Sequence, residues 1–262
     1  MHRKHLNPFV SLILILTFVA LACSTSYVQP TPTSKPKPTN TASVTPEPTQ
    51  TLRPTSTTRP TMTPNAEATQ HQTELEAEAQ AYFDQGYLAS ADGKFMEYED
   101  FKEEWAQLGW YSWWVLGQNA RDFYISAHFK WTSAYRSADI SGCGFAFAIQ
   151  EDEDHYAVFL DRSKVYFVET AGYFMPVGPT RGTGRVDFGN PFDEPVEADF
   201  TLIVKDAYAY VLVDGEVVGE YTLSQSKKLR GGLGLTLLSG TNKDFGTRCE
   251  MTNLRVWTPF GG

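Results

Sequence analysis

The sequence predicts an all-β domain, an antiparallel β-sandwich, behind a long N-terminal stretch that does not fold. Short runs of alternating apolar and polar residues fill the chain after residue 85, with the period of half-buried strands. Asp214-Gly215 joins two apolar runs, as in a tight type I′ hairpin. Almost no helical pattern interrupts these runs, and about 180 residues suit a single domain.

Residues 1–22 predict a secretory signal peptide. Two basic residues, Arg3 and Lys4, precede an uncharged run that ends at Ala22 and is too short to span a bilayer comfortably. The run closes with VALAC and so resembles the lipobox of bacterial lipoproteins, although that family prefers Leu where this chain has Ala20. The resemblance implies that Cys23 is acylated and anchors the protein to the cell membrane, facing the extracellular side. An ordinary signal peptide, which would leave Cys23 as a free thiol, is the alternative.

Residues 23–64 predict a disordered linker. Between residues 29 and 64 the chain holds 9 Pro and 12 Thr. This segment has almost nothing to bury, so it cannot offset the entropy cost of folding. Frequent prolines favour extended polyproline II, which at ~3.1 Å per residue would reach on the order of 100 Å. We therefore expect a spacer that holds a domain away from a membrane surface.

Residues 65–84 predict a short helix. The segment is rich in Ala, Glu and Gln, and Asn65 can cap it,. Because apolar residues are few, we expect this helix to be the end of the stalk and not part of the core. The β-sandwich domain is then expected to comprise residues 85–262.

The expected strands follow one another closely. In the run 122–131 the apolar residues share one face, namely Phe123, Ile125, Ala127, Phe129 and Trp131. The further strand-like runs are 143–149, 155–160, 164–169, the two arms of the hairpin within 199–221, 232–238 and 249–257. About eight strands with so little helix among them predict a closed antiparallel sandwich.

This order of strands resembles the concanavalin A-like jelly roll that legume lectins, laminin G domains and many glucanase-like modules share. The resemblance covers residues 122–259 and rests on the strand order and on the VDGE hairpin. Within this group the chain is most similar to the secreted bacterial 3-keto-disaccharide hydrolase domain family. The resemblance implies a jelly-roll β-sandwich with a glycan-binding or glycan-processing role, although one fold hosts many activities.

The acidic segment 151–154 invites comparison with the glucanases of this superfamily, which place three carboxylates on alternate residues of one strand. Glu151 and Glu153 alternate, but the third position is His155. Four adjacent charges between two apolar runs are typical of a solvated turn. No catalytic residue is therefore assigned, and we interpret the chain as a protein without catalytic activity in preference to an enzyme.

No metal ligands stand out in the sequence, and no cofactor is expected. The three histidines beyond the signal have no other His or Cys at metal-ligand spacing; they are His71, His128 and His155. A structural calcium ion is a further hypothesis, because some laminin G relatives carry one. Its candidate ligands would be Asp187, Asp193 and Asp199, which we expect in a loop.

The charge of the chain argues against a nucleic-acid partner. The formal net charge is −9, and removal of Arg3 and Lys4 with the signal would leave −11. Such a charge repels phosphate backbones.

Five aromatic residues within ten positions are the candidate glycan-binding residues: Trp105, Trp110, Tyr111, Trp113 and Trp114. They are too many for one strand face, so if Trp110 and Trp114 face inward, Tyr111 and Trp113 face outward, or the reverse. Exposed rings can stack on the apolar face of a pyranose. The alternative is that both sets are buried, one inside the sandwich and one under the helix.

Cys143 and Cys249 are expected to form a disulfide, because secretion places both thiols in an oxidising compartment. In a sandwich of this type the first and last strands lie side by side. The end of run 122–131 should therefore adjoin the start of run 249–257 and bring both cysteines to one edge. Their Cα atoms should lie ~4.4–6.8 Å apart. Two separate buried thiols would be the alternative.

Together these features favour a cell-surface lipoprotein that displays a non-catalytic, lectin-like glycan-binding module. Two alternatives remain open: a secreted glycan-processing hydrolase, and a structural or adhesion module that binds a protein partner.

Overall fold

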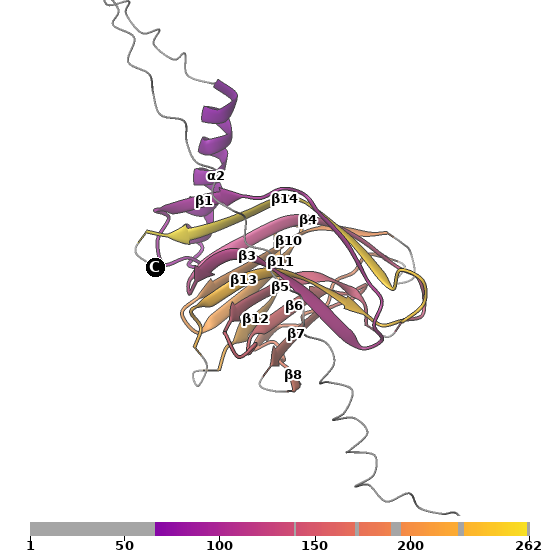
Figure 1. The fold of residues 1–262 in the computed structure, drawn as a ribbon. Helices are drawn as coiled ribbons and strands as arrows, with labels where there is room; N and C mark the ends of the chain where they lie inside the picture. Colours follow the sequence, from indigo (N-terminus) through magenta and orange to yellow (C-terminus); the bar gives the residue numbers. More distant parts are fainter. Residues whose placement is uncertain (1–65, 139, 171–172, 190–194, 225–227, 261–262) are drawn as a thin grey trace, which may run out of the picture. The chain divides into compact units, whose positions relative to one another are not determined.

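The computed structural model describes residues 66–138, 140–170, 173–189, 195–224 and 228–260 (Figure 1). Predictions that concern Cys23, the Pro/Thr-rich linker and the Asn65 cap lie outside these residues. Within them, no helix is long and apolar enough to cross a membrane.

The described chain forms one helix, α2 (Ala66–Asp84), and two antiparallel sheets. The eight-stranded sheet contains, in spatial order, β1 (Gly93–Glu97), β14 (Thr247–Pro259), β4 (Phe123–Ser133), β10 (Val196–Lys205), β11 (Tyr208–Val213), β12 (Glu216–Thr222) and β9 (Arg181–Gly182), with β2 (Phe101–Trp105) also paired to β14. The six-stranded sheet contains β3 (Trp110–Ala120), β13 (Gly231–Ser239), β5 (Gly142–Ile149), β6 (Tyr156–Leu160), β7 (Val165–Thr170) and β8 (Phe174–Pro176).

The predicted all-β, antiparallel jelly-roll sandwich is confirmed. Alternate residues of both sheets meet in one apolar core, where Phe129 of β4, Phe145 of β5 and Phe200 of β10 are fully buried. The Asp214-Gly215 turn joins β11 to β12, and both residues have positive φ, as a type I′ hairpin requires. Strands β1, β2, β8 and β9 were not predicted, because they are only two to five residues long and show little alternation.

The Cys143–Cys249 disulfide is confirmed, with Cα atoms 6.0 Å apart. As predicted, the end of β4 adjoins the start of β14, where Cys249 is opposite Trp131. The expectation that both cysteines lie at one edge is wrong. Cys143 is on β5 and Cys249 is on β14, which belong to different sheets and have neighbours on both sides. The bridge therefore crosses the core, and both residues are fully buried.

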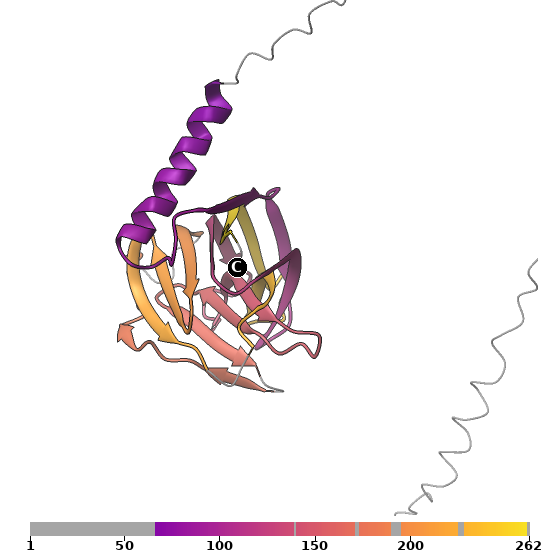
Figure 2. The same cartoon turned by 90° about the vertical axis from the view of Figure 1, so that its left-hand side faces the viewer.

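Helix α2 packs on the outer face of the eight-stranded sheet, so its interpretation as pure stalk is only half correct. Residues 67–74 of the helix are exposed, and its N-terminal half extends beyond the strands (Figure 2). Its second half buries Ala79 in a cluster with Tyr124 and Trp257 of the sheet. Glu78 adds an ion pair with Arg255 at 2.9 Å. These contacts, from residues far apart in the sequence, make the second half of the helix part of the domain.

Candidate functional site

A pocket of about 550 Å³ opens on the outer face of the six-stranded sheet, the sheet that α2 does not cover. Its lining combines aromatic rings with acidic and neutral polar groups: Gly109, Trp110, Tyr111, Trp113, Asp152, Glu153, Asp154, His155, Thr170, Tyr173 and Phe174. The volume suits a ligand of one or a few sugar rings, within the range of small-molecule sites.

Strand β3 supplies three of these rings. Tyr111 and Trp113 are two residues apart, so both point to the outer face,, and Tyr111 contacts the buried ring of Phe159 at 5.2 Å between centroids. Strands β13 and β5 lie between Tyr111 on β3 and Phe159 on β6. The β5 residue opposite Phe159 is Gly144, which has no side chain on the outer face. The glycine leaves room for rings to spread over the sheet.

The segment that opens β8 supplies the facing rings. Phe174 meets Trp110 at 5.4 Å and Tyr111 at 5.1 Å between centroids. Three rings of the pocket are open to solvent, with exposed fractions of 52% for Trp110, 67% for Tyr173 and 39% for Phe174. Rings from β3 and β8, the two edge strands of the sheet, thus bound one pocket.

A polar pair fixes the floor of the pocket. The hydroxyl of Tyr111 lies 2.7 Å from Nε2 of His155, and Nδ1 of the same imidazole lies 2.5 Å from the carbonyl oxygen of Glu153. A carbonyl can only accept, so Nδ1 carries the proton and Nε2 can accept from the tyrosine. Burial raises the pKa of Tyr111 far above its usual range, so this hydroxyl stays protonated. His155 thus links β3 to the acidic turn.

The acidic segment is the solvated turn that its sequence predicts. Strand β5 ends at Ile149 and β6 begins at Tyr156, and residues 151–153 are exposed. The backbone N–H of Asp154 donates to the carboxylate of Asp152 at 3.3 Å, and Glu153 has a positive φ of 66°. Asp152, Glu153 and Asp154 thereby line the pocket beside the aromatic rings.

The structure brings together three of the five predicted aromatic residues. Trp110, Tyr111 and Trp113 line the pocket, whereas Trp105 and Trp114 pack against the core between the sheets. Trp105 also donates from Nε1 to the carbonyl oxygen of Trp110 at 3.1 Å. Neither predicted arrangement of the strand holds in full, because Trp110 at its start is exposed while Trp114 is half-buried.

Sequence reasoning missed Tyr173, Phe174 and the role of His155. The only local signal was a pair of aromatic residues that follows the alternating run 164–169 after three further residues, in a position typical of a loop. Nothing local indicates that this loop meets β3, which lies at the opposite edge of the sheet.

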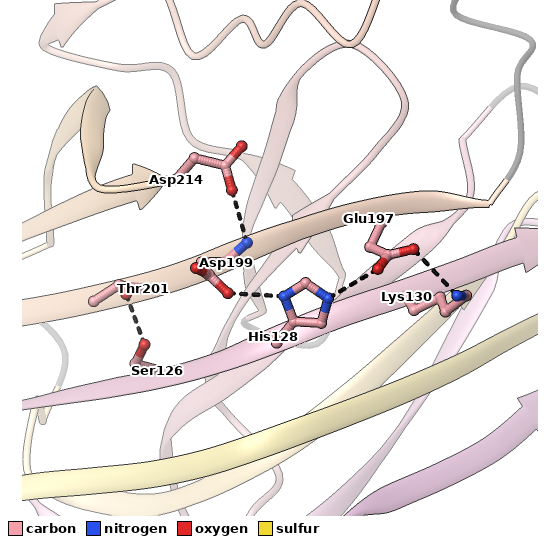
Figure 3. A network of polar contacts seen from close by, with 7 residues as sticks. All are labelled: Ser126, His128, Lys130, Glu197, Asp199, Thr201 and Asp214. Atoms are coloured by element: carbon pink, nitrogen blue, oxygen red, sulfur yellow. Dashed lines mark hydrogen bonds and ion pairs between the residues drawn. The ribbon is translucent and has the colours of Figure 1, made fainter.

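A second polar cluster lies on the outer face of the eight-stranded sheet (Figure 3). His128 of β4 is opposite Asp199 of β10, with Nδ1 2.8 Å from the Asp199 carboxylate and Nε2 3.3 Å from Glu197. Lys130 pairs with Glu197 at 3.2 Å. The hydrogen bond to Asp199 raises the pKa of His128, so the cluster favours the imidazolium form.

This cluster lacks the features of a glycosidase acid pair. Glu197, Asp199 and Thr201 alternate on one strand face,, but the third position carries a hydroxyl. Lys130, and then His128, lower the pKa of Glu197, which is opposite to the shift that a general acid needs. Sequence reasoning overlooked this Glu-Ala-Asp alternation in favour of the acidic turn.

The described residues contain no group of three or more His, Cys, Asp or Glu side chains arranged to hold a metal ion. The calcium hypothesis placed its ligands in one loop. Asp199 lies instead within β10, so that expectation is wrong for this residue. Asp187 accepts a hydrogen bond from the backbone N–H of Gly189 at 2.9 Å, and Asp193 lies outside the described residues.

No protein-family model matches the chain, and no curated protein matches it. Solved structures do. The carbohydrate-binding module CBM66 from Bacillus subtilis aligns with a TM-score of 0.42 and 12% identity, over 64% of this chain and 98% of that one. A Bacillus subtilis protein of unknown function with a galectin-like fold aligns with a TM-score of 0.45 and 10% identity, over 64% of this chain and 89% of that one.

A fructosyltransferase from A. japonicus aligns with a TM-score of 0.41 and 15% identity over 64% of this chain, which spans only 26% of that protein's length. These three similar structures are thus a carbohydrate-binding module, a protein with a galectin-like fold and a fructosyltransferase. All three TM-scores lie below 0.5, so none of them carries an argument about ligand or activity.

Proposed function

We propose that the domain is a non-catalytic, lectin-like glycan-binding module whose site is the aromatic pocket on the six-stranded sheet. The observation that carries the proposal is the group of three solvent-open rings, Trp110, Tyr173 and Phe174, around a pocket with polar groups. A large exposed aromatic surface is costly to leave in water unless a ligand covers it. The C–H face of a pyranose stacks on such rings, while carboxylates accept hydrogen bonds from its hydroxyls.

The hydrolase alternative has less support. Burial raises the pKa of Asp161, as a general acid would need. That carboxylate, however, is buried, faces the backbone N–H of Ser141 at 3.5 Å, and is not part of the pocket lining. Two of the pocket carboxylates, Asp152 and Glu153, stand on a turn that is exposed to water.

The proposal predicts that removal of one open ring abolishes most of the binding. A glycan array on the purified full chain identifies a ligand, and calorimetric titration then compares Trp110→Ala and Tyr173→Ala with the wild type. We expect each variant to weaken binding about tenfold or more, the effect of losing a central aromatic anchor. The matched control is Tyr208→Ala, which removes another solvent-exposed ring, 43% exposed, on the other sheet and should leave the affinity unchanged.

Turnover of the ligand in a hydrolysis assay would instead support the enzyme. Binding that persists in both ring variants would place the site elsewhere. A silent array, with no binding at any glycan, would favour a protein partner.

We further propose that the module is displayed at a cell surface through a lipid on Cys23. The support is the sequence of residues 1–23, with its basic start, apolar run and VALAC boundary. Two or more acyl chains hold a protein on a membrane stably, where one chain does not. Metabolic labelling with a palmitate analogue should mark the wild type and not Cys23→Ser. A labelled serine variant would contradict the anchor.

A further inference from the structure

From the charge and ring geometry of the pocket we infer that its ligand carries a protonated amine: the site selects amino sugars with a free ammonium group over neutral or N-acetylated sugars. This inference rests on the proposed function. It adds a chemical class of ligand to a site for which stacking alone would accept any pyranose.

The first argument is the arrangement of the rings. They meet at angles and not as flat stacks, with interplanar angles of 71° for Trp110 and Phe174, 40° for Tyr111 and Phe174, and 52° for Tyr111 and Trp113. Angled rings present faces to a shared space from more than one side. Ring faces carry partial negative charge, so such a space attracts a cation.

The second argument is the charge of the lining. Asp152 and Glu153 contribute two exposed carboxylates, and the lining contains neither Lys nor Arg among the described residues. The cation–π contacts recorded in the described part of the chain use other rings, those of Trp131, Tyr135 and Phe245. A cationic ligand would therefore meet the carboxylates of Asp152 and Glu153 with no Lys or Arg beside them in the described lining.

The third argument is the fixed position of the acidic turn. The imidazole of His155 donates to the Glu153 carbonyl at 2.5 Å and binds Tyr111 on β3 at 2.7 Å. This connection holds the turn against the ring-bearing strand and keeps Glu153 at its positive φ of 66°. Carboxylates and rings are thus placed together before the ligand arrives, which lowers the entropy cost of binding.

The contrast with the other sheet supports the assignment. There the charges are already paired within the chain, Lys102 with Glu250 at 3.4 Å, Arg248 with Glu104 at 2.5 Å and Lys130 with Glu197 at 3.2 Å. A cationic ligand would have to displace a cation of the protein on that face, whereas the described lining of the pocket holds no Lys or Arg beside Asp152 and Glu153.

The test uses two trisaccharides with the same backbone, a β-1,4-linked glucosamine trimer, which carries an ammonium group at each C2, and its fully N-acetylated counterpart, which carries a neutral acetamido group there. Both present the same ring faces. Calorimetric titration of the purified full chain at pH 6 should show the glucosamine trimer binding about tenfold more tightly, the combined effect of an exposed ion pair and a cation–π contact. The advantage should shrink at high salt, which screens exposed charges.

The decisive variant is Asp152→Asn/Glu153→Gln, which keeps the shape of the turn and removes two charges. It should lose most of the preference for the amine. Glu151→Gln is the matched control, because Glu151 lies in the same turn and is absent from the pocket lining; it should keep the preference.

Equal binding of both trimers, weakened by Trp110→Ala, would overturn the amine preference and leave the proposed function intact. Binding of the glucosamine trimer that neither the ring variant nor the acidic variant changes would overturn it as well, since attraction to the overall negative chain would explain it. If neither trimer binds, the amine preference is wrong, and the glycan array alone decides the proposed function.

Discussion

Replacement of both bridging cysteines, Cys143→Ala/Cys249→Ala, is expected to lower the free energy of unfolding by about 4 kcal/mol. The bridge joins positions 106 residues apart, and in the chain-entropy model a loop of this length is worth ~4–5 kcal/mol, although measured values often fall short. Loss of the fully buried sulfur contacts adds to this cost,. Denaturant unfolding of the wild type and the double variant measures the difference.

Reduction supplies an independent control. The wild type unfolded in the presence of a strong reductant should show nearly the stability of the double variant, because both then lack the loop constraint. Free thiols at both Cys143 and Cys249 in the denatured, unreduced wild type, or a double variant within ~1 kcal/mol of the wild type, would contradict the role of the bridge.

A single methyl group at Gly144 is expected to prevent stable folding. A Cβ added there would overlap the carbonyl oxygen of Val158 and would lie 2.8 Å from its carbonyl carbon and 2.9 Å from Cα of Phe159. These are backbone atoms of β6, which pairs with β5 at this position. Relief requires the two strands to separate, so Gly144→Ala should cost at least the ~1–3 kcal/mol of an overpacked core, and more because backbone atoms cannot rotate away.

The same substitution at an open site gives the control. Gly178→Ala places its Cβ where no atom lies within 4 Å. The stability of this variant should match that of the wild type or be slightly higher, because Ala lowers the conformational entropy of the unfolded chain. Thermal unfolding of both variants compares them. A Gly144→Ala protein as stable as Gly178→Ala would show that β5 and β6 are less closely packed than described.

The parts of the fold that the sequence predicts are those with local causes. The alternation in β4, the Asp214-Gly215 turn and the composition of α2 each follow from neighbouring residues. The disulfide was predictable because the chain beyond residue 23 has only two cysteines. That it joins the two sheets was not, because membership of a sheet depends on strand pairings between residues far apart.

The same distinction applies to the site. The cluster of aromatic residues around position 110 marks one wall of the pocket, and the acidic turn was correctly interpreted as solvated. Their meeting with Tyr173 and Phe174 was not predictable, because β8 is three residues long and its ring contacts cross the whole sheet. The packing of α2 on the sheet through Glu78 and Arg255 was not predictable for a similar reason, because 177 positions separate these two residues in the sequence.

Because the disulfide joins the two sheets, it also determines how the domain transmits a mechanical force. Strand β14 holds the helix through Arg255 and bears Cys249, whose partner Cys143 lies on β5, the strand that leads into the acidic turn of the pocket. A force applied between the acidic turn and the exposed end of α2 is therefore transmitted from sheet to sheet through a covalent bond. Without that bond, only side-chain packing and loops would keep the two layers from sliding apart under force.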